Sequence, residues 1–369
     1  MNIIDKTINI KGEIATVRCG KKEDHMASEF WPSIGEYPIY DEFLYVMMTN
    51  DLIRNKMYES AIKHEVSGKV VLDIGTGRDM NWALMALKYG AKKVYAIEVI
   101  KSSYEMANAK LKKLGHGDRV QLIYGNAKTV DLPEKVDVCV SEIIGMIGGS
   151  EGAEAILDDA RLRFLKPQGK MIPDVCETLV AAYTLPDNLY DNPTFNEFPL
   201  NYLEMLFKHC QKIFDPVLCI SNVDNGKVLS NSGIFESLRF NEDPANKQTR
   251  NETLEVTSKG RLDGLLLWLN LKGVNNGDIV DSLVQQTNWL PVYVPLFYPG
   301  IAVGVGDCLN LEITKVLSAD NIHPEYRISG DLTSQGKAKI TIEAEVGYNG
   351  SSQNYSNDYF KKLIQMKRK

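Results

Sequence analysis

Several features that would assign this chain of 369 residues to a specialised class of protein are scarce in its sequence. Its six cysteines form no C-x-x-C pair and its five histidines show no metal-ligand spacing, so we expect reduced thiols and no metal site. No apolar stretch approaches the roughly 20 residues of a membrane-spanning helix, and the start, Met1-Asn2-Ile3-Ile4, does not resemble a signal peptide. A net charge of -6 argues against a nucleic-acid partner. We expect a globular cytoplasmic protein.

The first half of the chain alternates between strand-like and helix-like patterns. Apolar residues at spacings of four predict helical structure over Asp41–Lys63. Beyond it we predict strands over Lys69–Ile74, Lys93–Glu98, Arg119–Tyr124 and Val136–Ser141, with helices over Met80–Tyr89, Ser102–Leu114 and Gly152–Leu165. Strands that alternate with helices of this length favour an α/β fold, with a parallel sheet covered on both faces.

The second half is dominated by strand-like segments. We predict strands over Val175–Leu185, Leu265–Leu271, Leu309–Val316 and Lys339–Val346, with one short helix over Leu203–Lys212. The expected organisation is an N-terminal appendage (1–40), a Rossmann-like domain (41–173) and an all-β sandwich or barrel (174–369).

A glycine turn follows the first predicted strand, in Asp73-Ile74-Gly75-Thr76-Gly77. The glycines allow a ligand to approach the backbone closely, and Asp79 is placed to cap the next helix. Glu98, 21 residues after Gly77, ends the next strand and suits two ribose hydroxyls. An NAD site would require a third glycine where Met80 stands, so Asp73 and Met80 favour S-adenosylmethionine. A turn without a ligand is the alternative.

Four motifs give the chain, from Tyr37 to Val346, a resemblance to the protein arginine methyltransferases. They are Met48-Thr-Asn-Asp51-Leu-Ile-Arg54, the loop from Glu142 to Glu151, the link Leu165–Asp174, and Gln286-Thr287-Asn288-Trp289. The resemblance implies a Rossmann-like methyltransferase domain followed by a β-barrel. It also implies that Arg54 meets the cofactor carboxylate and that Asn288 and Trp289 lie beside the substrate. The alternatives are a solvated helix charge for Arg54 and a barrel core residue for Trp289. Residues Gly125–Lys128 lie where this fold contacts adenine, so Asn126 and Ala127 are candidates there, with a plain turn as the alternative.

The two glutamates suit guanidine chemistry. A guanidinium has a pKa above about 12 and its nitrogens are poor nucleophiles while it is protonated. Two carboxylates can hold the planar cation and assist proton loss from the nitrogen that receives the methyl group. Four glycines in or next to the loop (Gly145, Gly148, Gly149, Gly152) allow Glu142 and Glu151 to converge. The alternative is that Glu151 only complements a helix dipole and Glu142 only ends a strand.

Two positions and one segment depart from the family pattern. Asn288 replaces the usual histidine and cannot titrate near neutrality. Asp79 replaces a small residue, and the aromatic signature near the N-terminus is reduced to Tyr37-Pro-Ile-Tyr40. These changes leave open the degree of methylation and the acceptor, for which the family default is a protein arginine and the alternative is free arginine or another small guanidine. They also allow a catalytically impaired regulatory subunit, although retention of both glutamates argues against it. The sequence Asp-Ile-Gly-Thr-Gly resembles that of the monomethylating branch of the family.

The family also suggests how subunits would assemble. The segment of about 186–216 resembles a dimerisation arm inserted early in the barrel. We expect a homodimer in which Leu203, Leu206 and Phe207 bury against the cofactor domain of a partner subunit.

Overall fold

Five parallel strands form the central sheet of the first half of the chain. The computed structural model describes residues 3–20, 27–34, 42–243, 249–275, 277–347 and 357–367. The strands, in the order β6-β5-β4-β7-β8, are β4 (Val70–Ile74), β5 (Lys93–Glu98), β6 (Val120–Tyr124), β7 (Val136–Ser141) and β8 (Leu165–Ile172). The chain first builds outward from β4 to β6 and then crosses back to β7. The carboxyl end of β4 is therefore the switch point at which such sheets bind ligands.

The helices of this domain agree closely with the predicted pattern. They are α1 (Glu42–Thr49), α2 (Leu52–Glu65), α3 (Asn81–Lys88), α4 (Lys101–Leu114) and α5 (Ala153–Phe164). The single helical stretch predicted from Asp41 is interrupted, because Asp51 caps α2 by accepting the Arg54 backbone N–H at 2.9 Å. Strand β8 was not predicted, since Pro167 and Gly169 conceal it. The strand–helix alternation itself is confirmed.

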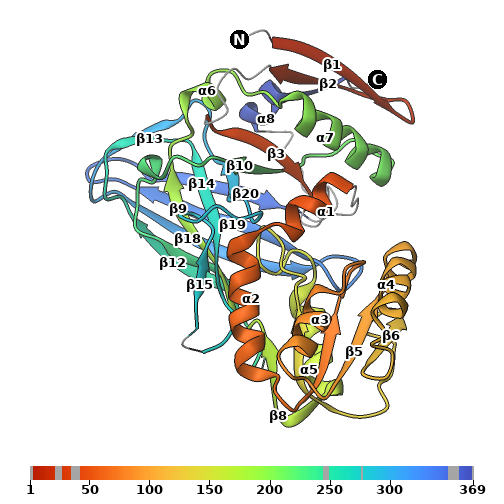
Figure 1. The fold of residues 1–369 in the computed structure, drawn as a ribbon. Helices are drawn as coiled ribbons and strands as arrows, with labels where there is room; N and C mark the ends of the chain where they lie inside the picture. Colours follow the sequence, from red (N-terminus) through yellow and green to blue (C-terminus); the bar gives the residue numbers. More distant parts are fainter. Residues whose placement is uncertain are drawn as a thin grey trace.

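Two antiparallel sheets form most of the second half (Figure 1). The larger has the order β11-β9-β14-β16-β10-β3, and β15 pairs with β14. Its strands are β3 (Glu29–Ser33), β9 (Val175–Tyr183), β10 (Val217–Ser221), β11 (Gly233–Arg239), β14 (Gly264–Lys272), β15 (Ile279–Asp281) and β16 (Val292–Pro295). The smaller sheet consists of β12 (Thr249–Glu255), β18 (Cys308–Leu317), β19 (Pro324–Thr333) and β20 (Ile340–Val346), and β13 (Gly260–Leu262) pairs with β17 (Ile301–Val303). One continuous hydrophobic core joins these strands to the parallel sheet.

The two ends of the chain meet in a third small sheet. Its strands are β1 (Ile3–Ile10), β2 (Glu13–Gly20) and β21 (Ile364–Lys367), and both chain ends lie beside it in Figure 1. The nearby helices are α6 (Asp187–Tyr190), α7 (Glu197–Cys210) and α8 (Asp358–Leu363), and a 3-10 turn spans Asn225–Lys227. Residues 1–40 are therefore more than an appendage, because β3 is an edge strand of the larger sheet.

Helix α7 differs most from the expectation. Leu203, Leu206 and Phe207 are fully buried within the chain itself, in a core that includes Ile8 and Val17 of the terminal sheet. The prediction that these three side chains contact a partner subunit is wrong, because β1, β2 and β3 pack against α7. The sequence showed the apolar face of the helix but not the strands that cover it. Within the described ranges, no helix is both long and apolar enough to cross a membrane.

Candidate active site

The predicted cofactor residues meet at the carboxyl edge of the parallel sheet. Strand β4 runs directly into the glycine turn, in which Gly75 and Gly77 have φ angles of +72° and +67°. Residues with a side chain rarely adopt this left-handed backbone, so glycine is required at both positions. A Cβ atom on Gly77 would also lie 3.2 Å from the hydroxyl of Tyr45 on α1. The turn is thus shaped for close approach to its backbone.

Asp73 is a fully buried carboxylate just before this turn. Its Oδ2 accepts hydrogen bonds from Thr76 Oγ1 at 2.6 Å and from the Ala83 backbone N–H at 3.0 Å. Its Oδ1 has no hydrogen-bond partner among the described residues. Burial raises the pKa of Asp73 to about 7. A buried carboxylate with one unused oxygen is prepared to accept a bond from a ligand, and a cationic donor would favour its charged form.

Glu98 holds the glycine turn in place from the end of β5. Its Oε2 accepts the Gly77 N–H and its Oε1 accepts the Ile100 N–H, both at 2.8 Å. Each carboxylate oxygen can accept a further bond, so the geometry leaves capacity for two hydroxyls.

The predicted adenine turn follows β6. The side chain of Asn126 accepts the Lys128 N–H at 2.9 Å and so closes its own turn. Ala127 is buried, and its carbonyl oxygen accepts a bond from the Arg163 guanidinium. Arg163 also donates to Val130 O at 2.8 Å. Arg163 was not identified from the sequence, since a charge near the end of a helix is common.

Arg54 and Glu142 form a buried ion pair. The guanidinium Nη1 lies 2.7 Å from Glu142 Oε2, and the two side chains are only 6% and 15% exposed. Burial raises the pKa of Glu142, while Arg54 opposes that rise. The Arg54 Nε has no partner among the described residues, so this cation retains a donor. The pair joins the predicted cofactor residue to the predicted catalytic residue.

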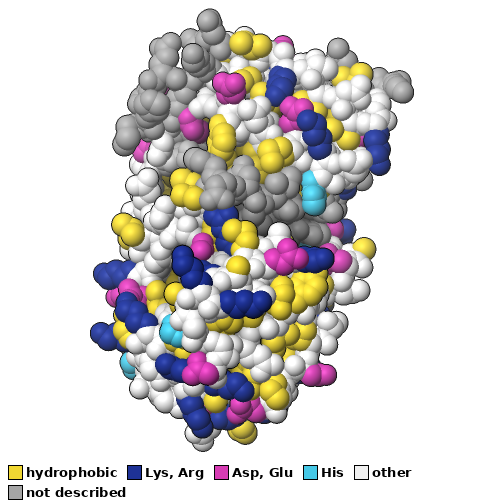
Figure 2. All heavy atoms as spheres, turned by 45° about the vertical axis from the view of Figure 1, so that its right-hand side comes forward, with side chains coloured by type: hydrophobic (Ala, Val, Ile, Leu, Met, Phe, Trp, Pro, Cys, Tyr) yellow, Lys and Arg dark blue, Asp and Glu magenta, His cyan; other side chains and the backbone are white. Residues whose placement is uncertain are grey.

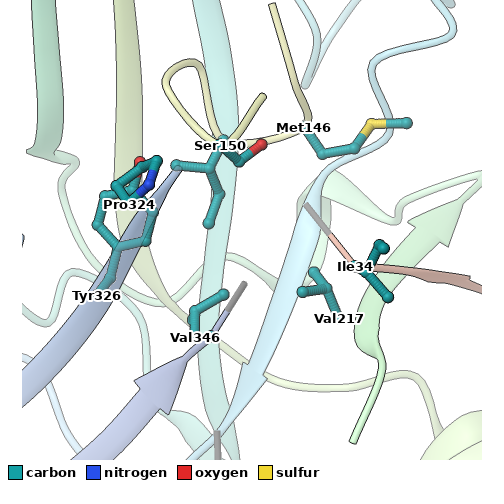
Figure 3. A pocket seen from close by; sticks show the side chains of 9 residues that line it. Ile34, Met146, Ser150, Val217, Pro324, Tyr326 and Val346 are labelled. Carbon is teal, nitrogen blue, oxygen red and sulfur yellow. The ribbon is translucent and has the colours of Figure 1, made fainter. Parts of the chain in front are cut away.

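The loop after Glu142 folds back on itself through successive turns. Ser150 N–H donates to Ile147 O at 2.8 Å and Gly152 N–H donates to Gly149 O at 2.9 Å. Figure 3 shows Met146 and Ser150 of this loop beside a small cavity, across from Tyr326 and Val346 of the barrel. Glu151 is half-buried at the end of the loop, directly before Gly152. Its convergence with Glu142 stays a prediction.

The Thr287–Trp289 segment forms hydrogen bonds with two other parts of the site. The Asn288 backbone N–H donates to Asp51 Oδ2 at 2.8 Å, and its side-chain amide donates to Met47 O at 2.7 Å. The buried Trp289 indole N–H donates to Ile144 O, also at 2.8 Å. One short segment therefore connects the start of α2 to the loop that follows Glu142. Asn288 has a structural role here, because it forms hydrogen bonds to Asp51 and Met47.

Asp79 does not cap helix α3 as predicted. Met80 occupies the N-cap position, with φ +53° and no side-chain cap bond. The Asp79 carboxylate instead lies 3.1 Å from Lys110 Nζ on α4. Its backbone N–H donates to the Tyr45 hydroxyl at 3.1 Å, and Arg78 stacks on the Tyr45 ring with 3.7 Å between Cζ and the ring centroid. Tyr45 was not identified from the sequence, because one aromatic residue in a helix gives no signal.

The two tyrosines of the N-terminal aromatic signature, Tyr37 and Tyr40, lie outside the described residues. Figure 2 shows Lys and Arg side chains interspersed with Asp and Glu over the visible surface of the lower lobe, which contains the cofactor domain.

Part of the chain is similar in sequence to proteins of a known family. Residues 35–172 match the family model described as PRMT5 arginine-N-methyltransferase. The chain is 39% identical over 130 residues to protein arginine N-methyltransferase PRMT10 of Arabidopsis thaliana, covering 34% of this chain and 33% of the relative. It is 34% identical over 163 residues to protein arginine N-methyltransferase 6 of Danio rerio, covering 43% and 44%. The chain thus spans less than half the length of these curated relatives.

Solved structures extend the likeness beyond the matched segment. The crystal structure of Arabidopsis thaliana protein arginine methyltransferase 10 has a TM-score of 0.67 at 22% identity and covers 83% of this chain and 97% of that one. The Trypanosoma brucei PRMT1 enzyme–prozyme heterotetrameric complex with AdoHcy gives 0.66 at 20%, covering 82% and 97%. At such identities the likeness shows the fold alone, a Rossmann-like methyltransferase domain with a β-barrel. Residues 35–172 are thus similar in sequence to protein arginine N-methyltransferases, and most of the chain is similar to them in fold.

Proposed function

We propose that this protein transfers a methyl group from S-adenosylmethionine to a guanidine nitrogen of arginine, with protein arginine as the acceptor. The observation that carries the proposal is the buried Arg54–Glu142 pair beside the glycine turn, because it places a carboxylate-binding cation and a guanidinium-binding acid next to each other. The family of the matched segment supports the same reaction.

The cofactor fits the polar atoms that the fold leaves available. S-adenosylmethionine carries a carboxylate and an ammonium group. At this site, the Arg54 Nε donor and the Asp73 Oδ1 acceptor are buried and have no hydrogen-bond partner among the described residues. Arg54 would hold the carboxylate and Asp73 would face the ammonium group. Glu98 would accept two ribose hydroxyls, with Gly75 and Gly77 against the ligand and Asn126–Ala127 beside adenine. When bound, the cofactor supplies a methyl group on a positively charged sulfur.

Residues of the chain itself would bind and orient the guanidine group of the acceptor. Glu142 and Glu151 would hold the planar cation and turn one nitrogen toward the methyl carbon. As the new N–C bond forms and the S–C bond breaks, one proton of that nitrogen passes to a carboxylate. Burial raises the pKa of Glu142, which suits this carboxylate to accept that proton. Trp289 and Asn288 would fix the loop that positions Glu142.

The direct test supplies labelled S-adenosylmethionine to the purified chain with an arginine-rich peptide, free arginine or host lysate. We expect label in the peptide and in lysate proteins, and mass spectrometry of the products separates mono- from dimethylarginine. Label in free arginine alone would replace the protein acceptor by a small guanidine. Cofactor binding without any labelled guanidine would contradict the proposal and favour a non-catalytic partner subunit.

The proposal also covers the oligomeric state and the cellular location of the protein. The protein would be a homodimer located in the cytoplasm, and neither a nucleic acid nor a membrane would be its partner. Because the apolar face of α7 is covered within the chain, the homodimer would use another surface. Light scattering at micromolar concentration should give twice the subunit mass, and a single subunit mass would remove the dimer from the proposal.

The titration of Asp73 predicts a pH dependence of cofactor binding. Its pKa is raised to about 7, so the ionised fraction rises from about a tenth at pH 6 to about nine tenths at pH 8. A bound ammonium group favours the ionised form. We therefore expect the cofactor affinity of the wild type, divided by that of Asp73→Asn, to rise about tenfold between these pH values. Calorimetry measures both, and the ratio removes the titration of the cofactor's own amine. A flat ratio would exclude contact between Asp73 and the ammonium group.

A further inference from the structure

A buried acid on the barrel contacts the loop that carries the two catalytic glutamates. Glu236 lies on β11 and is only 5% exposed. Its Oε2 accepts the backbone N–H of Gly149 at 2.8 Å. Gly149 belongs to the loop between Glu142 and Glu151. The barrel thus holds this loop by its backbone at a position between the two acids.

The charge of Glu236 is balanced by groups of the smaller sheet and of α5. The Tyr326 hydroxyl on β19 donates to Glu236 Oε1 at 3.0 Å, and Lys315 Nζ on β18 lies 3.3 Å from the same oxygen. Lys315 also pairs with Glu154 of α5, at 2.6 Å. A buried carboxylate is retained at low cost only when it is paired and hydrogen-bonded in this way. The network fixes the position of Glu236 from three elements of the chain.

The loop backbone approaches the barrel too closely for side chains to intervene. A Cβ atom on Gly149 would lie 2.7 Å from Glu236 Oε1, and one on Gly148 would lie 2.6 Å from Cys176 Sγ. The Gly148 N–H donates to Thr178 Oγ1 on β9 at 2.9 Å. Two consecutive loop amides therefore bond to the barrel. Glu236 is the charged one of the two acceptors, and bonds to charged acceptors are the stronger.

From this geometry we propose that Glu236 is a positioning residue for methyl transfer, which sets the spacing of Glu142 and Glu151 by holding the Gly149 amide. The inference rests on the proposed function, since it assigns a task to that same loop. It needs no contact between Glu236 and either ligand. A displacement of a reacting group by about 1 Å can lower a rate about 100-fold. Loss of the anchor should therefore lower kcat and leave cofactor affinity unchanged.

The test compares Glu236→Ala and Glu236→Gln with a matched control. Glutamine retains an acceptor for the Gly149 amide but loses the attraction to Lys315, so we expect kcat to fall about 10-fold in Glu236→Gln and about 100-fold in Glu236→Ala. The dissociation constant of S-adenosylmethionine should stay within twofold of the wild type. The control is Glu177→Gln on the neighbouring strand β9, whose acid pairs with half-exposed Arg239. It should retain wild-type kcat.

Hydrogen exchange of the 142–152 loop gives a readout that does not depend on activity. The Gly149 amide should exchange at least 10-fold faster in both Glu236 variants than in the wild type and in Glu177→Gln. If Glu236→Ala fails to fold, the comparison of Glu236→Gln with Glu177→Gln decides. Wild-type kcat and wild-type exchange in folded Glu236→Gln and Glu236→Ala would overturn the inference. Absence of methylation by the wild type, with fast exchange in the variants, would instead contradict the proposed function and leave the anchor standing.

Discussion

Substitution of Glu142 by glutamine is expected to lower kcat for arginine methylation by about 10²- to 10³-fold, the usual effect of removing one group that stabilises charge at a reacting centre. The amide has nearly the same shape as the carboxylate, but it cannot accept the proton that the guanidinium must lose. It also lacks the charge that orients the planar cation. Glu151→Gln should lower kcat by a similar factor, because the proposed clamp requires both acids.

The buried ion pair makes the expected change in cofactor affinity specific. In the wild type, Arg54 lies 2.7 Å from Glu142, which neutralises part of its charge. Glutamine at position 142 leaves that charge available for the cofactor carboxylate, so the dissociation constant of S-adenosylmethionine should stay the same or decrease. Glu105→Gln on the exposed face of α4 serves as the control. Full activity in Glu142→Gln or Glu151→Gln would remove that acid from the mechanism.

The part of the site that was predicted from the sequence depends on short stretches of chain. The turn at Gly75 and Gly77 follows from a buried strand that ends in residues able to adopt positive φ. Glu98 follows from the length of one strand–helix–strand unit. Within such short stretches the local sequence determines the backbone geometry, and contacts with distant parts of the chain alter it little.

Pairing between distant segments could not be predicted in the same way. Helix α7 has an apolar face, but its cover comes from β1 and β2, nearly 200 residues earlier in the chain. Glu236 is similar, since a carboxylate between Phe235 and Leu238 interrupts an apolar strand at an irregularity in the pairing of β11 with β9. The sequence does not show that this acid is buried, because its partners Gly149 and Lys315 come from other elements. Only the fold identifies what such residues contact.

Substitution of Arg54 by methionine is expected to weaken S-adenosylmethionine binding about 100-fold, because a charge-assisted bond to the cofactor carboxylate contributes about 1.5 to 3 kcal/mol. Methionine retains most of the packing against Trp82, whose ring centroid lies 5.6 Å from the guanidinium carbon. The same change leaves Glu142 buried without its cation. We therefore also expect the free energy of unfolding to fall by about 3 kcal/mol. Chemical denaturation measures the stability and calorimetry measures the binding.

The double variant Arg54→Met/Glu142→Gln separates these two effects. Removing both members of a buried pair is close to neutral for stability, so the free energy of unfolding should return to within about 1 kcal/mol of the wild type. Cofactor affinity should stay about 100-fold weaker, since no cation remains to hold the carboxylate. Arg239→Met removes a half-exposed cation of the barrel and should change neither quantity measurably. Recovery of wild-type affinity in the double variant would mean that the unpaired acid had caused the loss, and Arg54 would then not bind the cofactor. Weak binding in a stable double variant would instead assign the cofactor carboxylate to Arg54 by a measurement that does not depend on catalysis.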